Sequence, residues 1–156
     1  MGSDSDLPVM QDCINVLKEF AVPFEVHISS AHRLPEETAS LAKNASLKGI
    51  KVIVAGAGAA AHLAGVMASY TTLPVIGVPL SSPPLGGVDA LYATVQMPKG
   101  VPVATVAING AYNAGLLAVQ ILALEDPKLF QALKEFKEKL AEKVHSKRKE
   151  LEKFYS

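Results

Sequence analysis

The chain has 156 residues, of which 49% are apolar and 19% are charged. Fifteen Lys and Arg residues balance fifteen Asp and Glu residues, so the protein lacks the broad positive field that nucleic-acid-binding proteins use. The single cysteine, Cys13, excludes an intrachain disulfide framework and any zinc site with two thiolate ligands. We therefore expect one domain without a nucleic-acid partner. We also expect a reducing, cytoplasmic setting, because the first residues do not resemble a signal peptide.

The charges are unevenly distributed along the chain. No Asp, Glu, Lys or Arg occurs in residues 52–88 or 100–124, whereas residues 125–153 carry sixteen of the thirty formal charges. Prolines, glycines and polar residues interrupt both uncharged stretches, and a membrane-spanning helix needs about 20 predominantly apolar residues without such breaks. These stretches therefore indicate a buried core or a subunit interface, and no membrane partner is expected.

The hydrophobic patterns predict alternating helices and strands. Helices are favoured by Pro8 in a first turn and by Pro35 followed by two glutamates, with Gly49 as a C-terminal cap. In chain order the expected elements are a helix over 7–20, a strand over 24–29, a helix over 35–47, a strand over 50–55, a helix over 60–69, strands over 74–78 and 103–107, a helix over 111–124, and a long amphipathic helix from residue 127 almost to the end. This alternation predicts an α/β fold with a parallel sheet.

Two features of the chain bear on its organisation. The run Met1–Asp6 is turn-like and in such folds follows a first strand, so we expect the numbered chain to be truncated before it.

The helix over 111–124 is apolar nearly all round and must be covered on most sides. A homo-oligomer would cover it, and the alternative is that the C-terminal helix folds back over it. We expect one α/β domain over 1–124, with 125–156 as a helix packing on it or on a neighbouring subunit.

Polar side chains follow several of the predicted strands. Ligands of open parallel sheets bind beyond the carboxyl ends of the strands. The residues expected there come from four loops: Ser3, Ser5 and Asp6; Ser30, His32 and Arg33; Gly56, Ala57, Gly58 and His62; and Ser81 with Ser82.

Arg33 and His32 are the most informative of these residues. A guanidinium beside serine hydroxyls and helix N-termini suits a phosphate or carboxylate, and the alternative is an ion pair with Glu36 or Glu37. Imidazole exchanges protons near neutral pH, so His32 is a candidate acid/base, although it could merely hydrogen-bond its loop. His62 could equally belong to the core or contact a ligand.

Other chemistries find little support in the sequence. The Gly56–Gly58 pair lacks the third glycine of a dinucleotide-binding turn. The four histidines do not have metal-ligand spacing, so no metal site is expected. No G-x-S-x-G elbow accompanies the serines, which argues against a hydrolase triad.

Five motifs in chain order resemble the N5-carboxyaminoimidazole ribonucleotide mutase (PurE) family of purine biosynthesis. They are G-S-D-S-D (2–6), S-A-H-R-L-P (30–35), A-G-A-G-A-A-A-H-L-A-G (55–65), P-V-I-G-V-P (74–79) and V-Q-M-P-K-G-V-P-V-A-T (95–105). The resemblance implies a flavodoxin-like three-layer αβα sandwich and a homo-octamer with no metal or organic cofactor. It also implies an isomerase that moves a carboxylate from the exocyclic nitrogen of a ribonucleotide to ring carbon C4.

The resemblance also implies roles for individual residues. Ser3 and Ser5 would bind the phosphate together with Arg33, Asp6 would bind the ribose hydroxyls, and His32 would be the general acid/base. The pocket for the imidazole and the migrating carboxylate would be lined by Ser30, Gly56, Ala57, Gly58, His62 and Leu63. The chain departs from the family pattern at Leu34, Ala59 and Ala64, and Ala59 could place a Cβ where the backbone needs a positive φ.

Two alternative functions remain at this point. A second branch of the family carboxylates aminoimidazole ribonucleotide directly with carbon dioxide, but it shows S-A-H-K-T and A-G-R-S-N-A-L where this chain has Arg33, Pro35 and the loop over 55–65. The other alternative is a nucleotide-binding paralogue without catalytic activity.

Overall fold

Three strands lie side by side in one parallel sheet of the order β1-β2-β3. The structure is a computed structural model that describes residues 1–155. β1 (Ile53–Gly58) pairs with β2 (Val75–Leu80) along its whole length, from Ile53 opposite Val75 to Gly58 opposite Leu80. β3 (Ala104–Thr105) pairs with the start of β2. Every residue of β2 is buried, as expected for the central strand of a parallel sheet covered on both faces.

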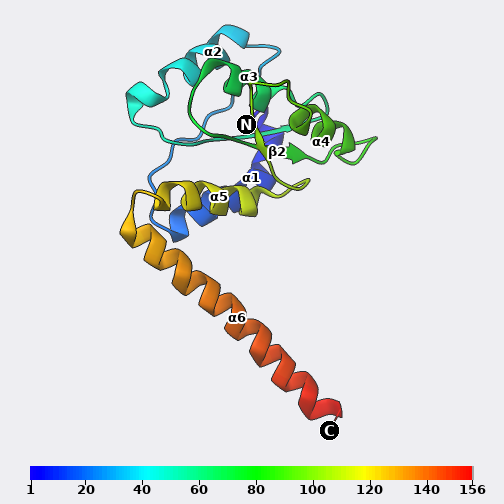
Figure 1. The fold of residues 1–156 in the computed structure, drawn as a ribbon. Helices are drawn as coiled ribbons and strands as arrows, with labels where there is room; N and C mark the ends of the chain where they lie inside the picture. Colours follow the sequence, from blue (N-terminus) through cyan, green and yellow to red (C-terminus); the bar gives the residue numbers. More distant parts are fainter. Residues whose placement is uncertain (156) are drawn as a thin grey trace.

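Helices cover both faces of this sheet (Figure 1). α1 (Leu7–Glu19) and α5 (Ala111–Ala123) pack on one face, where they share a core with alternate side chains of β2. α2 (Pro35–Asn44) and α3 (Leu63–Tyr70) pack on the other face with residues of β1. The fold is therefore the α/β, flavodoxin-like three-layer sandwich that the sequence predicts.

Most of the predicted helices are confirmed. α1, α5 and α6 (Pro127–Tyr155) end within one residue of their expected limits. α2 is shorter than expected, because the chain continues into a 3-10 turn, η2 (Ser46–Lys48). Gly49 ends that turn with φ 81°, the left-handed conformation that glycine adopts at helix C-termini.

α4 (Val88–Val95) was not among the expected elements. It lies over β2, where a Cβ on Gly77 would overlap the methyl group of Thr94. α4 therefore packs directly on the backbone of the central strand, on the same face as α3.

The strand predictions need two corrections. Residues 24–29, expected to form a strand, belong to no assigned strand. Among residues 1–155, only Met1 forms backbone hydrogen bonds with this segment. The strand expected over 50–55 is instead β1, three residues later. Gly56, Ala57 and Gly58, expected as a turn, are thus the last residues of a paired strand.

α6 is only partly packed against the rest of the chain. Its first turns cover the end of α5, with Leu133 buried and the ring of Phe136 edge-on to Phe20 at 5.7 Å between centroids. The remainder projects away from the α/β body (Figure 1). The alternative that the C-terminal helix covers α5 is therefore realised for its first turns. Within the described residues, no helix has the length and apolar character needed to cross a membrane.

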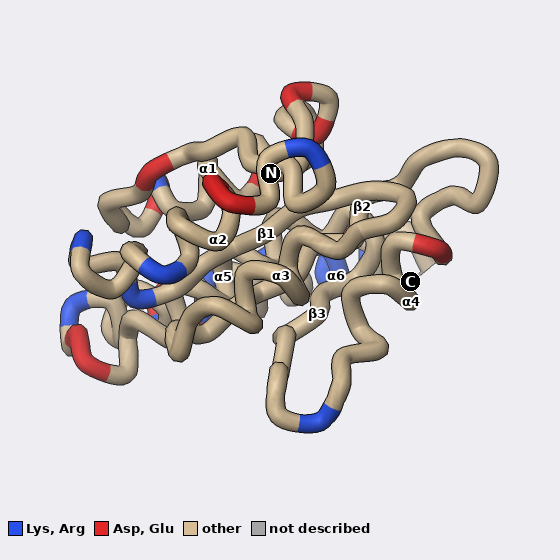
Figure 2. Tube along the Cα trace, turned by 90° about the horizontal axis from the view of Figure 1, so that it is seen from above, with Lys and Arg blue, Asp and Glu red and all other residues tan. Residues whose placement is uncertain are grey.

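Charged residues surround a largely uncharged centre. In Figure 2, Lys, Arg, Asp and Glu lie around the periphery of the body, while the segments around β1, β2 and β3 carry neither sign. This matches the absence of charged residues from positions 52–88.

Candidate active site

Three of the four predicted loops meet at the carboxyl end of β1. The amide of Gly2 donates to the carbonyl of Gly56 at 3.1 Å, and the amide of Ser29 donates to the carbonyl of Met1 at 2.8 Å. These bonds hold the loops over 2–6, 29–33 and 56–58 next to one another, as the sequence predicts.

The first loop is a 3-10 turn, η1 (Asp4–Asp6), that leads directly into α1. Ser3 caps it: its hydroxyl accepts from the amide of Ser5, and a carboxylate oxygen of Asp6 accepts from the amide of Ser3 at 2.9 Å. The Ser5 hydroxyl donates to that of Ser3 at 3.0 Å. This reciprocal capping box fixes the backbone of the turn and directs two hydroxyls and a carboxylate to the same rim.

The second loop places Arg33 beside Ser30. The backbone amide and the Nε atom of Arg33 both lie 3.3 Å from the Ser30 hydroxyl oxygen, to which they donate. Within residues 1–155 the guanidinium forms no ion pair, so the alternative pairing with Glu36 or Glu37 is not formed. Arg33 is exposed, as a group that binds an anion from solvent requires.

The pKa of Asp4 indicates that the first two loops lie close together. Its pKa is lowered, chiefly by the hydrogen bond from Ser3 and, to a smaller extent, by the positive charge of Arg33. The guanidinium therefore acts electrostatically on the turn that carries Ser3 and Ser5.

The imidazoles of His32 and His62 are hydrogen-bonded to each other. Nε2 of His32 lies 2.8 Å from Nδ1 of His62, and the two rings meet edge to face. His62 directly precedes α3 and is exposed, as is His32. His62 is therefore not a core residue, and the sequence did not indicate that it would contact His32.

Small residues form the floor between these loops. A Cβ on Gly58 would lie 3.3 Å from the carbonyl oxygen of Leu80 and 3.5 Å from the hydroxyl of Ser82. The hydroxyl of Ser82 is buried and has no hydrogen-bond partner within residues 1–155. Ser82 belongs to the fourth loop that the sequence predicts at this rim, and its distance from Gly58 places that loop beside the end of β1.

Two predicted features behave differently from the rest of the site. Leu63 is 3% exposed and packs in the core between α2, α3 and the sheet, unlike the exposed His62 beside it. Ala59 has φ 50°, the left-handed conformation in which a Cβ is unfavourable.

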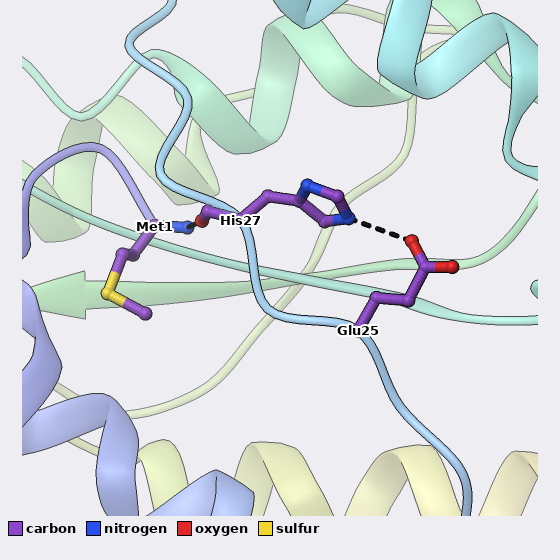
Figure 3. Close-up of polar contacts among 3 residues, drawn as sticks. All are labelled: Met1, Glu25 and His27. Atoms are coloured by element: carbon purple, nitrogen blue, oxygen red, sulfur yellow. Dashed lines mark hydrogen bonds and ion pairs between the residues drawn. The ribbon is translucent and has the colours of Figure 1, made fainter.

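The remaining histidines lie away from this rim. His27 contacts Glu25 at 2.8 Å through its Nε2 atom, and its carbonyl accepts from the Met1 ammonium at 2.8 Å (Figure 3). Within residues 1–155, no three His, Cys, Asp or Glu side chains are grouped so that they could hold a metal ion.

Comparison with known proteins gives a consistent family. Residues 1–143 match the model of the AIR carboxylase family. The chain is 54% identical over 152 residues to an N5-carboxyaminoimidazole ribonucleotide mutase of Thermotoga maritima, covering 97% of this chain and 89% of that protein. It is 56% identical to a protein of the same name from Synechocystis, with 97% and 86% coverage.

Two further similarities extend this comparison. The chain is 55% identical over 152 residues to a phosphoribosylaminoimidazole carboxylase of Saccharomyces cerevisiae, covering 97% of this chain but 27% of that longer protein. The crystal structure of Treponema denticola PurE superposes with a TM-score of 0.85 at 30% identity, covering 94% of this chain and 91% of that one.

Proposed function

Because the chain belongs to the AIR carboxylase family, we propose that it is an N5-carboxyaminoimidazole ribonucleotide mutase, an isomerase of purine biosynthesis. It would convert N5-carboxyaminoimidazole ribonucleotide to 4-carboxy-5-aminoimidazole ribonucleotide. The observation that supports this most directly is the meeting of the serine-rich turn, Arg33 and the His32–His62 pair at one rim. Groups suited to bind a phosphate and groups suited to transfer a proton thus lie together.

The phosphate end of the substrate would bind between the first two loops. Ser3 and Ser5 offer hydroxyl donors, and Arg33 offers charge-assisted hydrogen bonds to the phosphate oxygens. Asp6 uses one carboxylate oxygen to hold the turn, and its other oxygen would accept from a ribose hydroxyl. Ser30 orients Arg33 through the contact at 3.3 Å.

The base would then lie over Gly56, Ala57 and Gly58, near the histidine pair. Breaking the N–carboxylate bond releases carbon dioxide and requires a proton on the exocyclic nitrogen. Carbon dioxide then adds to C4, and the proton on that carbon must be removed. His32 can deliver the first proton and accept the second, so no net proton is consumed.

Carbon dioxide must stay near C4 between these two steps. The end of β1 carries no side chain larger than a methyl group, which leaves room for a small neutral molecule against the backbone. A site of this kind, closed by bound substrate, would limit the escape of carbon dioxide. The proposed chemistry uses no metal, organic cofactor or covalent nucleophile.

We propose that the enzyme is a homo-oligomer, with an octamer as the specific expectation. Support comes from α6, where Leu140, Val144 and Leu151 are 45%, 66% and 59% exposed. Their spacing continues the face through which Leu133 packs on the body. Residues 125–156 would therefore pack on a neighbouring subunit of the catalytic domain 1–124. The free thiol of Cys13 is compatible with the cytoplasm, where we place the enzyme.

The decisive experiment gives the purified protein each candidate substrate in turn. We expect conversion of N5-carboxyaminoimidazole ribonucleotide at a rate that does not depend on added bicarbonate. The yeast relatives named as carboxylases make direct carboxylation the second candidate. Turnover of aminoimidazole ribonucleotide only with bicarbonate would establish that reaction instead, and binding without turnover of either substrate would indicate a paralogue without catalytic activity.

A further inference from the structure

The serine-rich turn carries a second carboxylate, that of Asp4, beside the hydroxyls proposed to bind the phosphate. The Ser3 hydroxyl donates to a carboxylate oxygen of Asp4 at 3.0 Å. Asp4 and Ser5 are exposed and Ser3 is half-buried, so this contact lies on the open side of the turn. A negative charge at this place opposes the binding of an anion, because like charges repel each other.

The hydrogen bonds of the turn determine where both hydroxyl protons point. An ionised carboxylate only accepts hydrogen bonds, so Ser3 donates its single proton to Asp4. Ser3 can then only accept in its 3.0 Å contact with Ser5, and the proton of Ser5 points to Ser3. Both hydroxyls therefore donate inside the turn. A phosphate group, whose ionised oxygens are acceptors, would find neither proton directed toward it.

Asp4 uses the same kinds of donor that a phosphate would use. Its pKa is lowered first by the hydrogen bond from Ser3, then by the backbone amides of Asp4 and Ser5, and to a smaller extent by the charge of Arg33. Hydroxyls, backbone amides and a guanidinium are the groups that bind phosphates in proteins. The carboxylate of Asp4 therefore acts as an internal anion at the proposed phosphate site.

The shape of the turn does not depend on the side chain of Asp4. The amide of Ser5 donates to the Ser3 hydroxyl oxygen at 3.4 Å, and the amide of Ser3 donates to Asp6 at 2.9 Å. Within residues 1–155, Asp4 forms no ion pair with Arg33 or with any other cation. Its contact with the Ser3 hydroxyl can therefore be lost while the capping box stays in place.

We propose that Asp4 competes with the phosphate of the substrate: its carboxylate holds the Ser3 and Ser5 hydroxyls in the free protein and must release them before the phosphate binds. This inference rests on the function proposed above, which places a phosphate at this turn. Exposed side chains change rotamer within picoseconds to nanoseconds, so a rotation of Asp4 is enough for the release. Ser3 and Ser5 can then both donate to phosphate oxygens.

Asp4 should therefore change the affinity for nucleotides more than the rate of the reaction. The substrate and the product of the proposed reaction carry the same phosphate, so Asp4 weakens the binding of both. An interaction that is equal in the ground state and the transition state alters KM and does not raise kcat. Competition by Asp4 would also favour release of the product.

The test replaces Asp4 in the full chain. Asp4→Ala removes both the charge and the acceptor, whereas Asp4→Asn removes the charge and keeps an acceptor for the Ser3 hydroxyl. The matched control is Asp12→Asn, which removes the same charge from an exposed residue of α1 that lies near Tyr112. Titration calorimetry measures the binding of 4-carboxy-5-aminoimidazole ribonucleotide, of the corresponding nucleoside and of inorganic phosphate.

We expect Asp4→Ala to bind the ribonucleotide and inorganic phosphate about threefold to tenfold more tightly than the unaltered protein does. Asp4→Asn should show a smaller gain, and this gain should shrink at high salt because it comes from the charge alone. Neither variant should bind the nucleoside more tightly. In the mutase assay, KM of Asp4→Ala should fall by the same factor without a rise in kcat.

Unchanged or weaker binding of the ribonucleotide by both Asp4 variants would overturn the proposal. An equal gain for the nucleoside, or for Asp12→Asn, would also overturn it, because the gain would then not come from the phosphate site. If the unaltered protein does not bind the ribonucleotide, the proposed function fails instead. The titration with inorganic phosphate then decides by itself whether Asp4 competes with an anion at this turn.

Discussion

Nε2 of His32 and Nδ1 of His62 are 2.8 Å apart, so one imidazole donates to the other. The proton between them ties the tautomer of His32 to that of His62. In the proposed mechanism, the ring that protonates a nitrogen and later deprotonates a carbon would thereby be held in one orientation.

The first prediction concerns this pair. His62→Leu removes the partner of His32 and should lower kcat by about 10- to 100-fold with little change in KM, because His62 positions the acid/base. His62→Asn keeps a polar atom near the position of Nδ1 and should recover most of the loss. His32→Asn should abolish isomerisation while nucleotide binding remains measurable. Full turnover by the His32 variant would show that His32 is not the acid/base.

The second prediction concerns Arg33. Arg33→Ala should weaken nucleotide binding by about 10- to 100-fold, the usual worth of a hydrogen bond to a charged group. Titration calorimetry with the nucleotide and its dephosphorylated analogue checks the cause. The analogue should lose less than about threefold if the phosphate is the partner of the guanidinium. Equal losses for both ligands would mean that Arg33 acts on the structure of the loop.

The third prediction concerns Ala59, whose φ is 50°. Ala59→Gly removes a left-handed cost of about 1–2 kcal/mol but adds about 0.5–1 kcal/mol of chain entropy in the unfolded state. We expect a net gain in stability of up to about 1.5 kcal/mol by denaturant unfolding. Ala60→Gly, one residue later at a position without positive φ, serves as the control and should destabilise the protein. Equal effects at both positions would mean that Ala59 is not strained.

The fourth prediction concerns Cys13. Burial raises the pKa of its thiol from 9.0 to about 11, so the native protein should react with a thiol reagent at pH 8 about 100-fold more slowly than free cysteine. Reaction should become complete in denaturant. Because the folded state disfavours the thiolate, stability should be unaffected below pH 9 and fall as the pH rises toward 11. Rapid labelling of the native protein would contradict the burial.

The fifth prediction concerns the exposed apolar face of α6. Val144→Lys and Leu151→Lys should reduce the mass measured by light scattering, since a charge on this face would oppose subunit packing. Glu142→Lys adds positive charge elsewhere on the same helix and should leave the mass unchanged. An unaltered mass in all three variants would exclude α6 as the contact.

Much of the fold could be predicted because its signals are local. Pro35 with its two glutamates, Gly49 and the apolar run of α5 determine helix limits through neighbouring residues, and these limits hold within a few residues. The segment 24–29 failed for a different reason: its side chains favour a strand, but a strand also needs a partner, and the sequence pattern does not show which partner is present. Similarly, Gly56–Gly58 resembles a turn until its pairing with Val78–Leu80 is known.

In the candidate site, too, local signals could be predicted from the sequence, whereas contacts between distant residues could not. The turn before the first predicted helix indicated Ser3, and the loop after the strand expected over 24–29 indicated His32 and Arg33; the structure brings these two loops together. The contact between His32 and His62 joins residues thirty positions apart and has no local signature. The unpartnered hydroxyl of Ser82 likewise depends on how β1 and β2 are aligned at their ends.

The length of α6 has a geometric consequence. Its 29 residues extend about 44 Å at 1.5 Å per residue, and only the first turns lie on their own body. Any neighbouring molecule that covers Val144 and Leu151 must therefore lie far from the centre of this molecule. The helix would act as a spacer, setting how far apart the centres of two neighbouring molecules are held.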